Sequence, residues 1–326
     1  MTPKISWIVT GGSGFIGSVL LWKLNEQGLD RLLVVDRLDA SEKWKNLRGK
    51  RFLDYVEADS FLEGLEAGRF NEAEGIVHLG ACSSTTETDA TFLIRNNTEY
   101  TKRLALWALA KKKKFVYASS AATYGDGSRG YTTDVATTEK LQPLNLYGYS
   151  KQLFDLWALR QGVLGKLVGI KFFNVFGPNE YHKGDMRSVV AKAYDQILKD
   201  GKIRLFRSHR NDYQDGEQQR DFLYVKDAVA VVSELMQARP FGGGLYNLGA
   251  GVSRTWNDLA KAIFAALGKS PRIDYVEMPE HLRPKYQYHT LADMRWRKGG
   301  RKPFHTLEDG VGDYVQNYLS KENPYI

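Results

Sequence analysis

The sequence predicts an α/β protein: a doubly wound parallel sheet of the Rossmann type, with a smaller α/β unit toward its C-terminal side. Two observations predict this fold class. Short apolar runs alternate with segments of helical spacing in the first half, and a glycine-rich turn follows the first run. Continuous apolar runs without polar alternation are typical of strands covered on both faces. Strand–helix–strand repetition of this kind gives parallel strands joined by right-handed crossovers.

The individual elements are predicted from the same spacing. In the first half, strands are expected at 5–9, 32–35, 76–79, 115–118 and 167–173, and helices at 15–24 and 153–159. In the less regular second half, we expect short strands at 222–225 and 245–248, helices at 257–267 and 307–319, and a polar loop at 207–219.

The length of 326 residues suggests about two domains, at roughly 150 residues per domain. We predict a dinucleotide-binding domain at 1–172, with returning segments near 221–243 and 288–297. The smaller domain, expected to bind a substrate, is then formed by 173–220 and 244–326. No repeat or low-complexity linker separates the two, so we expect the smaller domain to grow out of the sheet.

The composition favours a globular protein of the reducing cytoplasm. Hydrophobic residues make up 43% of the chain and charged residues 26%, which is ordinary for such proteins. The longest stretch without a charged residue, 5–22, is shorter than the roughly 20 residues that span a membrane. We therefore expect no membrane partner and no secretory signal. The single cysteine, Cys82, excludes an internal disulfide framework.

The net charge of +8 supports nucleic-acid binding only weakly. The one dense basic run, 111–114, lies between a helical and a strand pattern, where solvated lysines at a helix end are expected. We expect no nucleic-acid partner. No C-x-x-C or H-x-x-x-H spacing occurs and the histidines are scattered, so we predict no metal site.

The turn at 10–17 predicts a dinucleotide site. Gly12, Gly14 and Gly17 satisfy G-x-G-x-x-G, and Gly11, Gly14 and Gly17 satisfy G-x-x-G-x-x-G. Such glycines allow a tight turn, close approach of the backbone to a pyrophosphate, and close helix–strand packing. The pyrophosphate then meets the free N–H groups at a helix N-terminus.

The choice between NAD and NADP depends on the residues that end the second strand. Asp36 could accept a hydrogen bond from a ribose hydroxyl, which favours NAD. Arg37 and Lys43 could pair with a 2′-phosphate, which favours NADP. We predict NADP, with NAD as the alternative.

Tyr147 and Lys151 lie four residues apart at the start of a predicted helix, and so share one face. A nearby ammonium favours the phenolate form of tyrosine, so the pair can act as a base toward a hydroxyl that is being oxidised. Lys151 can also hold a nicotinamide ribose. Ser119 and Ser120 end a predicted strand, and a serine hydroxyl there can hydrogen-bond the reacting oxygen.

At these residues the chain resembles the extended short-chain dehydrogenase/reductase family, over residues 10 to about 286. The segments that carry the resemblance are 80–87 (GACSSTTE), 117–125 (YASSAATYG), 143–151 (PLNLYGYSK), 173–178 (FNVFGP) and 182–184 (HKG). Within the family it is similar to members that bind NADP tightly, one per subunit, and invert one carbon of an ADP-linked heptose for the lipopolysaccharide inner core. The resemblance also implies a homo-oligomer.

The resemblance implies roles for individual residues. Tyr147 and Lys183 would transfer protons in the two orientations of the sugar, with Lys151 and Ser120 as the other catalytic residues. The implied cofactor contacts are Gly11, Gly14, Phe15, Ile16, Gly17, Asp36, Arg37, Lys43, Gly80, Ala81, Ser83, Asn96, Lys151 and Val175. The substrate side is assigned to Ser120, Asn174, Asp185, Lys192, Phe206, Arg207, Ser208, His209, Arg220 and Tyr286.

Arg220 suits a diphosphate because its planar fork pairs bidentately; the alternative is an ion pair with Asp221. Asp185 and Lys192 depart from the family pattern, as does the long 207–219 loop, which bears on the sugar. Three other functions are alternatives. A dehydratase typically needs an acid where Ala121 and Ala122 follow Ser120. A UDP-sugar 4-epimerase and a non-catalytic nucleotide- or RNA-binding relative are the remaining alternatives.

Overall fold

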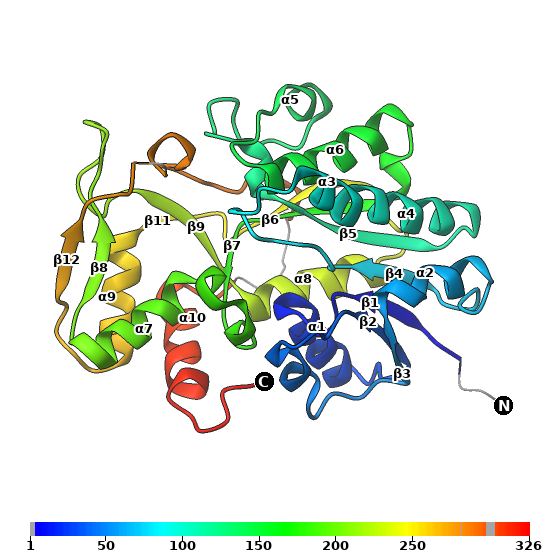
Figure 1. Ribbon diagram of the computed structural model, residues 1–326, viewed down its shortest axis with the longest axis horizontal. Helices are drawn as coiled ribbons and strands as arrows, with labels where there is room; N and C mark the ends of the chain where they lie inside the picture. The colour runs from blue at the N-terminus through cyan, green and yellow to red at the C-terminus, as the bar shows by residue number, and fades with distance from the viewer. Residues whose placement is uncertain (1–3, 281, 298–303) are drawn as a thin grey trace.

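The computed structural model describes residues 4–280, 282–297 and 304–326. Its larger part is a seven-stranded parallel sheet with helices on both faces, and its smaller part holds two short sheets and three helices (Figure 1). The predicted fold class is confirmed. No helix in the described part of the chain is long and apolar enough to cross a membrane.

The strand order of the main sheet is β10-β6-β5-β4-β1-β2-β3. The strands are β1 (Trp7–Thr10), β2 (Leu32–Asp36), β3 (Asp54–Glu57), β4 (Gly75–His78), β5 (Lys114–Ser120), β6 (Val168–Phe172) and β10 (Gly244–Leu248). The central strand β1 lies between β2 and β4, with Val9 opposite Val34 and Val77. The order reverses between β1 and β4, and ligands of such sheets bind at the carboxyl ends of the strands at that point.

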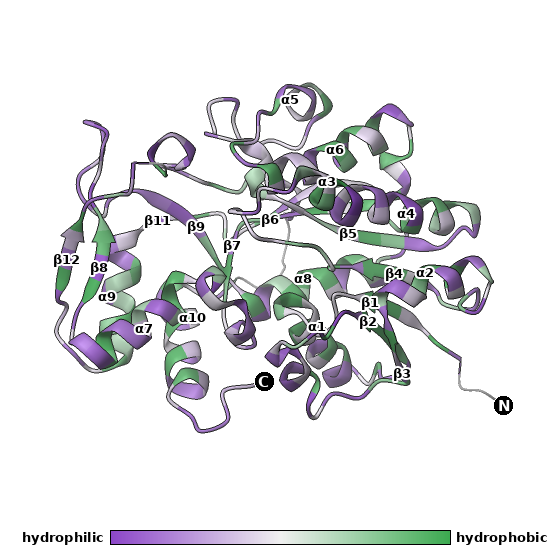
Figure 2. Ribbon diagram, in the orientation of Figure 1, coloured by the Kyte–Doolittle hydropathy of each residue, from purple (hydrophilic) through white to green (hydrophobic). Residues whose placement is uncertain are grey.

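Alternate residues of the central strand enter two different cores, one on each face of the sheet. Val9 packs in the cluster of α1 (Phe15–Glu26) and α8 (Val225–Gln237), whereas Ile8 packs with α2 (Ala58–Glu66), α4 (Tyr100–Ala110) and α6 (Leu146–Arg160). Figure 2 colours the strands of the sheet mostly green, the hydrophobic end of its scale. The buried double face explains why these strands were predictable from continuous apolar runs.

The smaller part is built from short strands and three helices. Its three-stranded sheet has the order β11 (Ser253–Thr255), β9 (Gln219–Tyr224), β7 (Asn174–Phe176), and β8 (Ile203–Phe206) pairs with β12 (Ile273–Val276). The helices are α7 (Val189–Asp200), α9 (Trp256–Ala266) and α10 (Leu307–Tyr314). Two short helices, α3 (Ala90–Leu93) and α5 (Val135–Lys140), lie beside the main sheet (Figure 1).

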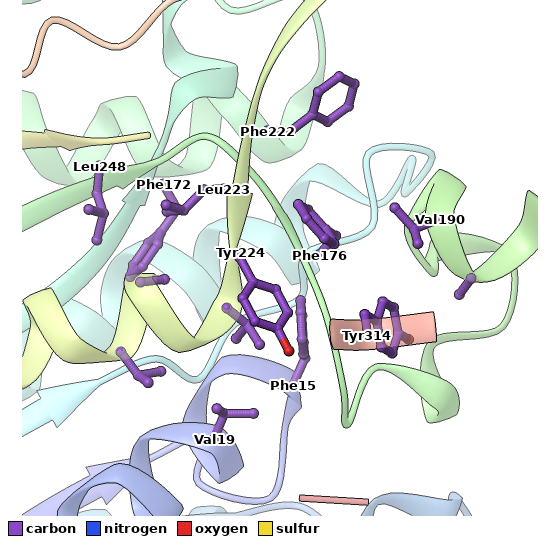
Figure 3. Packing of buried hydrophobic residues seen from close by; sticks show 14 of the residues in the cluster. Phe15, Val19, Phe172, Phe176, Val190, Phe222, Leu223, Tyr224, Leu248 and Tyr314 are labelled. Atoms are coloured by element: carbon purple, nitrogen blue, oxygen red, sulfur yellow. The ribbon is translucent and has the colours of Figure 1, made fainter. Parts of the chain in front are cut away.

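One hydrophobic cluster runs from the main sheet into the smaller part. In Figure 3, Phe15 of α1 lies near Phe176 of β7 and Tyr224 of β9, with Tyr314 of α10 beyond them. The rings of Phe176 and Tyr224 are 5.5 Å apart. Because the cluster is continuous, the smaller part packs against the helix that follows the glycine-rich turn.

The buried carboxylate of Asp221 joins β9 to two other segments. It accepts hydrogen bonds from the backbone N–H groups of Ala250 (2.5 Å), Gly251 (3.0 Å) and Ala292 (2.9 Å). Burial raises its pKa to about 6. All three of these N–H groups would lose their acceptor without Asp221, and an unpartnered buried donor is costly. This carboxylate therefore ties β9, which also carries Arg220, to the segments at 250–251 and 292.

Most predicted helices and strands agree with the structure to within a few residues, but α6 begins seven residues before the predicted 153. In the first half β3, α2 and α4 were not predicted, and neither were several elements of the second half. The returning segment differs from the predicted 221–243. Residues 221–224 belong to β9 of the smaller part, while α8 and β10 carry the chain back to the main sheet. The boundary predicted at 244 therefore assigns β10, a strand of the main sheet, to the smaller domain. Residues 1–3 and 298–303 of the predicted domains lie outside the described residues.

The basic run 111–114 lies only partly at the solvated end of α4. Lys114 begins β5, and its ammonium donates to the carbonyls of Met236 and Ala238, each at 3.1 Å. Burial lowers its pKa. The expectation of solvated lysines was therefore wrong for Lys114, because its carbon stem runs along β5 toward the end of α8.

Candidate active site

A cavity of about 730 Å³ lies at the carboxyl ends of the central strands. It is lined by the glycine-rich turn, the loop after β4, the end of β5, the first turns of α6 and the segment 182–190. The predicted site residues that line it are Gly11, Gly14, Phe15, Ile16, Gly17, Asp36, Lys43, Gly80, Ala81, Ser83, Ser120, Tyr147, Lys151, Asn174, Val175 and Lys183. Segments far apart in the sequence thus meet at one edge of the sheet.

The glycine-rich turn has no room for side chains. Gly11 has a φ of +70°, and a Cβ added there would lie 2.4 Å from the backbone nitrogen of Gly80. A Cβ at Gly17 would lie 2.0 Å from the carbonyl oxygen of Gly11. Gly14 stands directly before α1, whose first N–H groups have no side-chain cap. These residues fit a dinucleotide: the bare turn lets a pyrophosphate approach the helix N-terminus.

Asp36 is bound into the turn by its neighbours. Its Oδ2 accepts a hydrogen bond from the N–H of Ser13 at 2.9 Å, and its Oδ1 accepts one from the N–H of Arg37 at 2.8 Å. The ammonium of Lys43 is 3.2 Å from Oδ1 and also donates to the Arg37 carbonyl. Both carboxylate oxygens therefore already have partners.

Arg37 extends from Asp36 toward the open side of the same site. Its guanidinium donates to Asp59 at 3.0 and 2.6 Å and to Asn96 Oδ1 at 2.9 Å. The hydrogen bond to Asp59 raises the pKa of Arg37. Arg37 and Asn96, both predicted as cofactor contacts, thus bind each other, and neither lines the cavity.

Tyr147 stands in the first turn of α6, where Asn145 caps the helix by accepting a hydrogen bond from the N–H of Gly148 at 2.8 Å. Burial raises the pKa of the Tyr147 phenol, and a hydrogen bond with Ser120 opposes this effect. The sequence had predicted a lowered pKa. The ammonium of Lys151 instead donates to the carbonyl of Ala118 at 2.9 Å, so it acts on the end of β5 rather than on the phenol.

Lys151 itself is 4% exposed. Burial lowers its pKa to about 8, and the charge of Asp155 opposes this effect. Lys151 therefore loses its proton at a lower pH than an ordinary lysine, which titrates near ~10.4.

Lys183 reaches the cavity from the 3₁₀ segment Tyr181–Met186, which follows β7. Its ammonium lies 5.4 Å from the centre of the Phe15 ring. Burial lowers its pKa, and the buried carboxylate of Glu180 opposes this effect. Glu180 accepts from the hydroxyl of Ser188 at 2.6 Å, which holds the base of the loop. Lys183 and Tyr147 thus enter one cavity from unrelated elements.

Asn46 and His182 are two further polar residues at the site. His182 belongs to the HKG segment that carried the resemblance, whereas the sequence did not single out Asn46. The amide of Asn46 donates to the carbonyls of Ser13 at 2.9 Å and Asn179 at 3.1 Å, and lies 3.2 Å from Nδ1 of His182. Burial lowers the pKa of His182 to about 4. Asn46 therefore ties the glycine-rich turn to the loop that carries Lys183. No sequence signal marked it, because it lies in an isolated 3₁₀ turn.

The substrate-side residues form a second group, connected to the cavity through Trp256. The buried guanidinium of Arg220 lies 5.0 Å from the ring centre of Tyr286 and 5.6 Å from that of Trp256. Trp256 lines the cavity, and the ring of Phe206 packs against Tyr286 at 6.5 Å. Arg220 and Asp221, both described, form no ion pair with each other, so that alternative was wrong.

The remaining predicted substrate residues do not line the cavity. Lys192 donates to the carbonyl of Asp185 at 3.1 Å on the outside of the Lys183 loop. Arg207 and His209 each lie about 3.5 Å from the carboxylate of Glu277, and Ser208 donates its N–H to Asp215. Arg207, Ser208 and His209 belong to the long loop between β8 and β9.

Comparison with known proteins places this site in a family. The model of the "NAD dependent epimerase/dehydratase family" matches residues 7–249. A protein of Nitratidesulfovibrio vulgaris named ADP-L-glycero-D-manno-heptose-6-epimerase is 53% identical over 98% of this chain and 100% of its own length. One of the same name from Fusobacterium nucleatum is 46% identical over 98% and 99%. The crystal structure of the Helicobacter pylori enzyme of that name superposes with a TM-score of 0.78 at 27% identity, covering 96% of each chain.

The chain belongs to the NAD dependent epimerase/dehydratase family. It is an enzyme, and its cofactor is a nicotinamide dinucleotide.

The glycine-rich turn allows a direct test of cofactor binding. In Gly17→Ala the new methyl group would displace the Gly11 carbonyl, so we expect the purified variant to lose its nicotinamide dinucleotide, measured after denaturation. Gly312→Ala is the control, because a Cβ there meets open space within α10. It should keep the dinucleotide and gain up to about 1 kcal/mol in stability. Full retention of dinucleotide by Gly17→Ala would contradict the assignment.

Proposed function

We propose that the enzyme is a nucleotide-sugar epimerase. Its particular reaction is the inversion of C6 of the heptose in ADP-D-glycero-β-D-manno-heptose, which gives ADP-L-glycero-β-D-manno-heptose, a precursor of the lipopolysaccharide core. The observation that carries this proposal is that Tyr147 and Lys183 enter one cavity from different elements, beside a turn that fits a dinucleotide. The names of the relatives at 53% and 46% identity support the choice of sugar.

The chemistry requires both a cofactor and proton-transfer groups. An isolated alcohol carbon has no acidic hydrogen, so its configuration cannot be inverted by proton exchange alone. A bound nicotinamide supplies removal of a hydride from that carbon and its return. The side chains of this chain handle the proton on the substrate oxygen and hold the sugar in place.

Tyr147 and Ser120 act together at the substrate oxygen in one orientation of the sugar. The Ser120 hydroxyl is a hydrogen-bond partner of the Tyr147 phenol, so an oxygen placed between them could exchange its proton with Tyr147. Lys151, one helical turn further, lines the same cavity and is placed to hold a ribose.

Lys183 serves the other orientation. When the C6 end of the sugar turns over, its oxygen points to the opposite side of the cavity, away from Tyr147. Burial lowers the pKa of Lys183, so its amine takes up and releases a proton more readily near neutral pH than an exposed lysine. Arg220 lies buried among aromatic rings, donates a hydrogen bond to the Gln219 carbonyl at 2.8 Å, and is suited to the diphosphate.

The proposed cofactor is NADP, tightly bound, with one molecule per subunit. Two observations support NADP over NAD. The carboxylate of Asp36 is occupied by Ser13, Arg37 and Lys43, so it is a poor acceptor for a free ribose hydroxyl. Arg37 and Lys43 place two cations beside that position, which suits a 2′-phosphate.

The activity is tested by incubating the purified protein with ADP-D-glycero-β-D-manno-heptose and separating the epimers. We propose no membrane or nucleic-acid partner, a homo-oligomeric state and a cytoplasmic location for the enzyme. Conversion of UDP-glucose to UDP-galactose, with no conversion of the heptose, would instead identify a UDP-sugar 4-epimerase.

Cofactor identity is expected to follow the two cations. Released cofactor, assayed enzymatically, should be NADP, and Arg37→Ala should weaken its retention by removing a phosphate partner. Arg103→Ala is the control, since Arg103 forms an exposed ion pair with Glu66 away from the cavity. Recovery of NAD alone, with retention unchanged in Arg37→Ala, would contradict the choice of NADP.

Tyr147→Phe removes the phenolic oxygen and keeps the ring. We expect turnover to fall by about 10²-fold or more, the scale of a positioned acid–base group, while cofactor content and thermal stability stay close to the wild type. Tyr149→Phe is the matched control, because Tyr149 is exposed two residues further along α6. Turnover of Tyr147→Phe within a few-fold of the wild type would remove Tyr147 from the reaction.

Lys183→Met removes the amine and keeps most of the carbon stem. Each inversion uses both orientations, so we expect this variant to lose epimerisation as severely as Tyr147→Phe. Dismutation of an analogue with a C6 aldehyde needs hydride transfer but no inversion, and should be better preserved in both variants. Lys199→Met, at an exposed site near the end of α7, is the control. Full epimerase activity in Lys183→Met would exclude the mechanism with two bases.

A further inference from the structure

A fully buried ion pair lies directly behind the Tyr147–Lys151 pair. Asp155 stands one helical turn beyond Lys151 on α6, and its carboxylate is 2.7 Å from the ammonium of Lys171 on β6. Both side chains are 0% exposed. Neither residue lines the cavity, so neither can touch a substrate there.

Every charged atom of this pair has further partners. Asp155 Oδ1 accepts from the Tyr117 hydroxyl at 2.9 Å, and Oδ2 accepts from the Ser119 hydroxyl at 2.7 Å. The ammonium of Lys171 donates to Thr123 Oγ1 at 2.7 Å and lies 5.2 Å from the ring centre of Tyr124. The pair is thus held in one geometry by both ends of the segment 117–124.

Stability alone is a weak explanation for this pair. Burying two charges costs solvation that their attraction often fails to recover, and apolar residues of similar size are frequently as stable. The position of the ion pair is informative because three consecutive residues of β5 bind three residues of α6. Ser119 bonds Asp155. Ala118, on one side of it, bonds Lys151, and Ser120, on the other side, bonds Tyr147. The ion pair and the catalytic pair therefore share one scaffold.

We propose that Asp155 and Lys171 are positioning residues. Lys171 holds the carboxylate of Asp155 in place through their ion pair, and Asp155 keeps Lys151 in its ammonium form against the Ala118 carbonyl. The importance of Lys151 for a reaction rests on the proposed function. The effect of Asp155 on the charge of Lys151 does not, and it can be measured in this chain without any reaction. The ammonium of Lys151 is the group that can hold a ribose in this cavity, so its charge state matters for the reaction.

The surroundings of Lys151 leave Asp155 as the principal acidic group near it. Burial lowers the pKa of Lys151 to about 8, and Asp155 is the first of the groups that oppose this effect, followed by the thiol of Cys82. His78 faces Lys151 from β4, and burial lowers the pKa of His78 to about 3, so it carries no charge near neutral pH. Among the described residues, the titratable groups that interact electrostatically with Lys151 are Asp155, Cys82 and His78.

The direct test is the titration of Lys151 in the cofactor-free protein. Lysine labelled with ¹³C at Cε reports deprotonation by NMR, and Lys151→Arg assigns the signal. In Asp155→Asn we expect the midpoint to fall by about 1 pH unit or more, the effect of losing a close opposite charge. Asp313→Asn is the matched control, because Asp313 pairs with Lys226 at 2.6 Å outside the cavity. Its Lys151 midpoint should equal that of the wild type.

A double variant separates charge from folding. Asp155→Asn leaves the Lys171 ammonium without its counter-ion, which lowers stability. Asp155→Asn with Lys171→Met removes both charges, so it should recover thermal stability while the Lys151 midpoint stays low. Lys171→Arg keeps the charge and should keep the wild-type midpoint. If the double variant recovers both stability and the wild-type midpoint, the pair is only structural and the proposal is wrong.

The activity readout is kept apart from the titration. If the enzyme epimerises the heptose, the high-pH limb of its kcat profile should move to lower pH in the double variant, together with the Lys151 midpoint. If the wild type has no epimerase activity, the proposed function fails, while the titration still decides the electrostatic role of Asp155. An unchanged midpoint in the double variant overturns the inference even in a fully active enzyme.

Discussion

The site depends on the contact between the carboxyl end of β5 and the first turns of α6. Ala118 accepts from Lys151, and Ser120 bonds Tyr147, so the geometry of the proposed catalytic residues is set by backbone register rather than by flexible loops. The register is fixed in turn by the parallel pairing of β5 with β4 and β6. A shift of one residue along β5 would exchange the faces of 118 and 119 and separate both pairs.

Burial of charge is the second constraint. Lys151, Lys183 and Arg220 are held in largely buried surroundings, where burial lowers the pKa of each. Cations in such surroundings interact more strongly with a bound anion or with a developing negative charge than they would in water. Asp155 and Glu180 each lie close to one of the two lysines and limit the effect of burial.

The amino-acid sequence by itself determined the sheet and the cofactor side of the site. Strands covered on both faces must be continuously apolar, so β1, β2 and β4 were visible as runs, and the glycines at 11 and 17 marked the turn where no Cβ fits. The four-residue spacing of Tyr147 and Lys151 is a property of a helix, which local sequence encodes. The resemblance to a known family supplied Lys183, which no local pattern marked.

Only the tertiary structure decided the pKa shifts and hydrogen bonds of the site residues and the return of the chain to the main sheet through β10. The pKa of Tyr147 is raised because of burial by distant segments, and the Lys151 ammonium turns to Ala118, neither of which a spacing of four residues contains. The pairing of Asp155 with Lys171 joins α6 to β6, and β10 joins the main sheet after 71 intervening residues. Such contacts depend on which surfaces the fold presses together, whereas sequence patterns record only what each segment buries along its own axis.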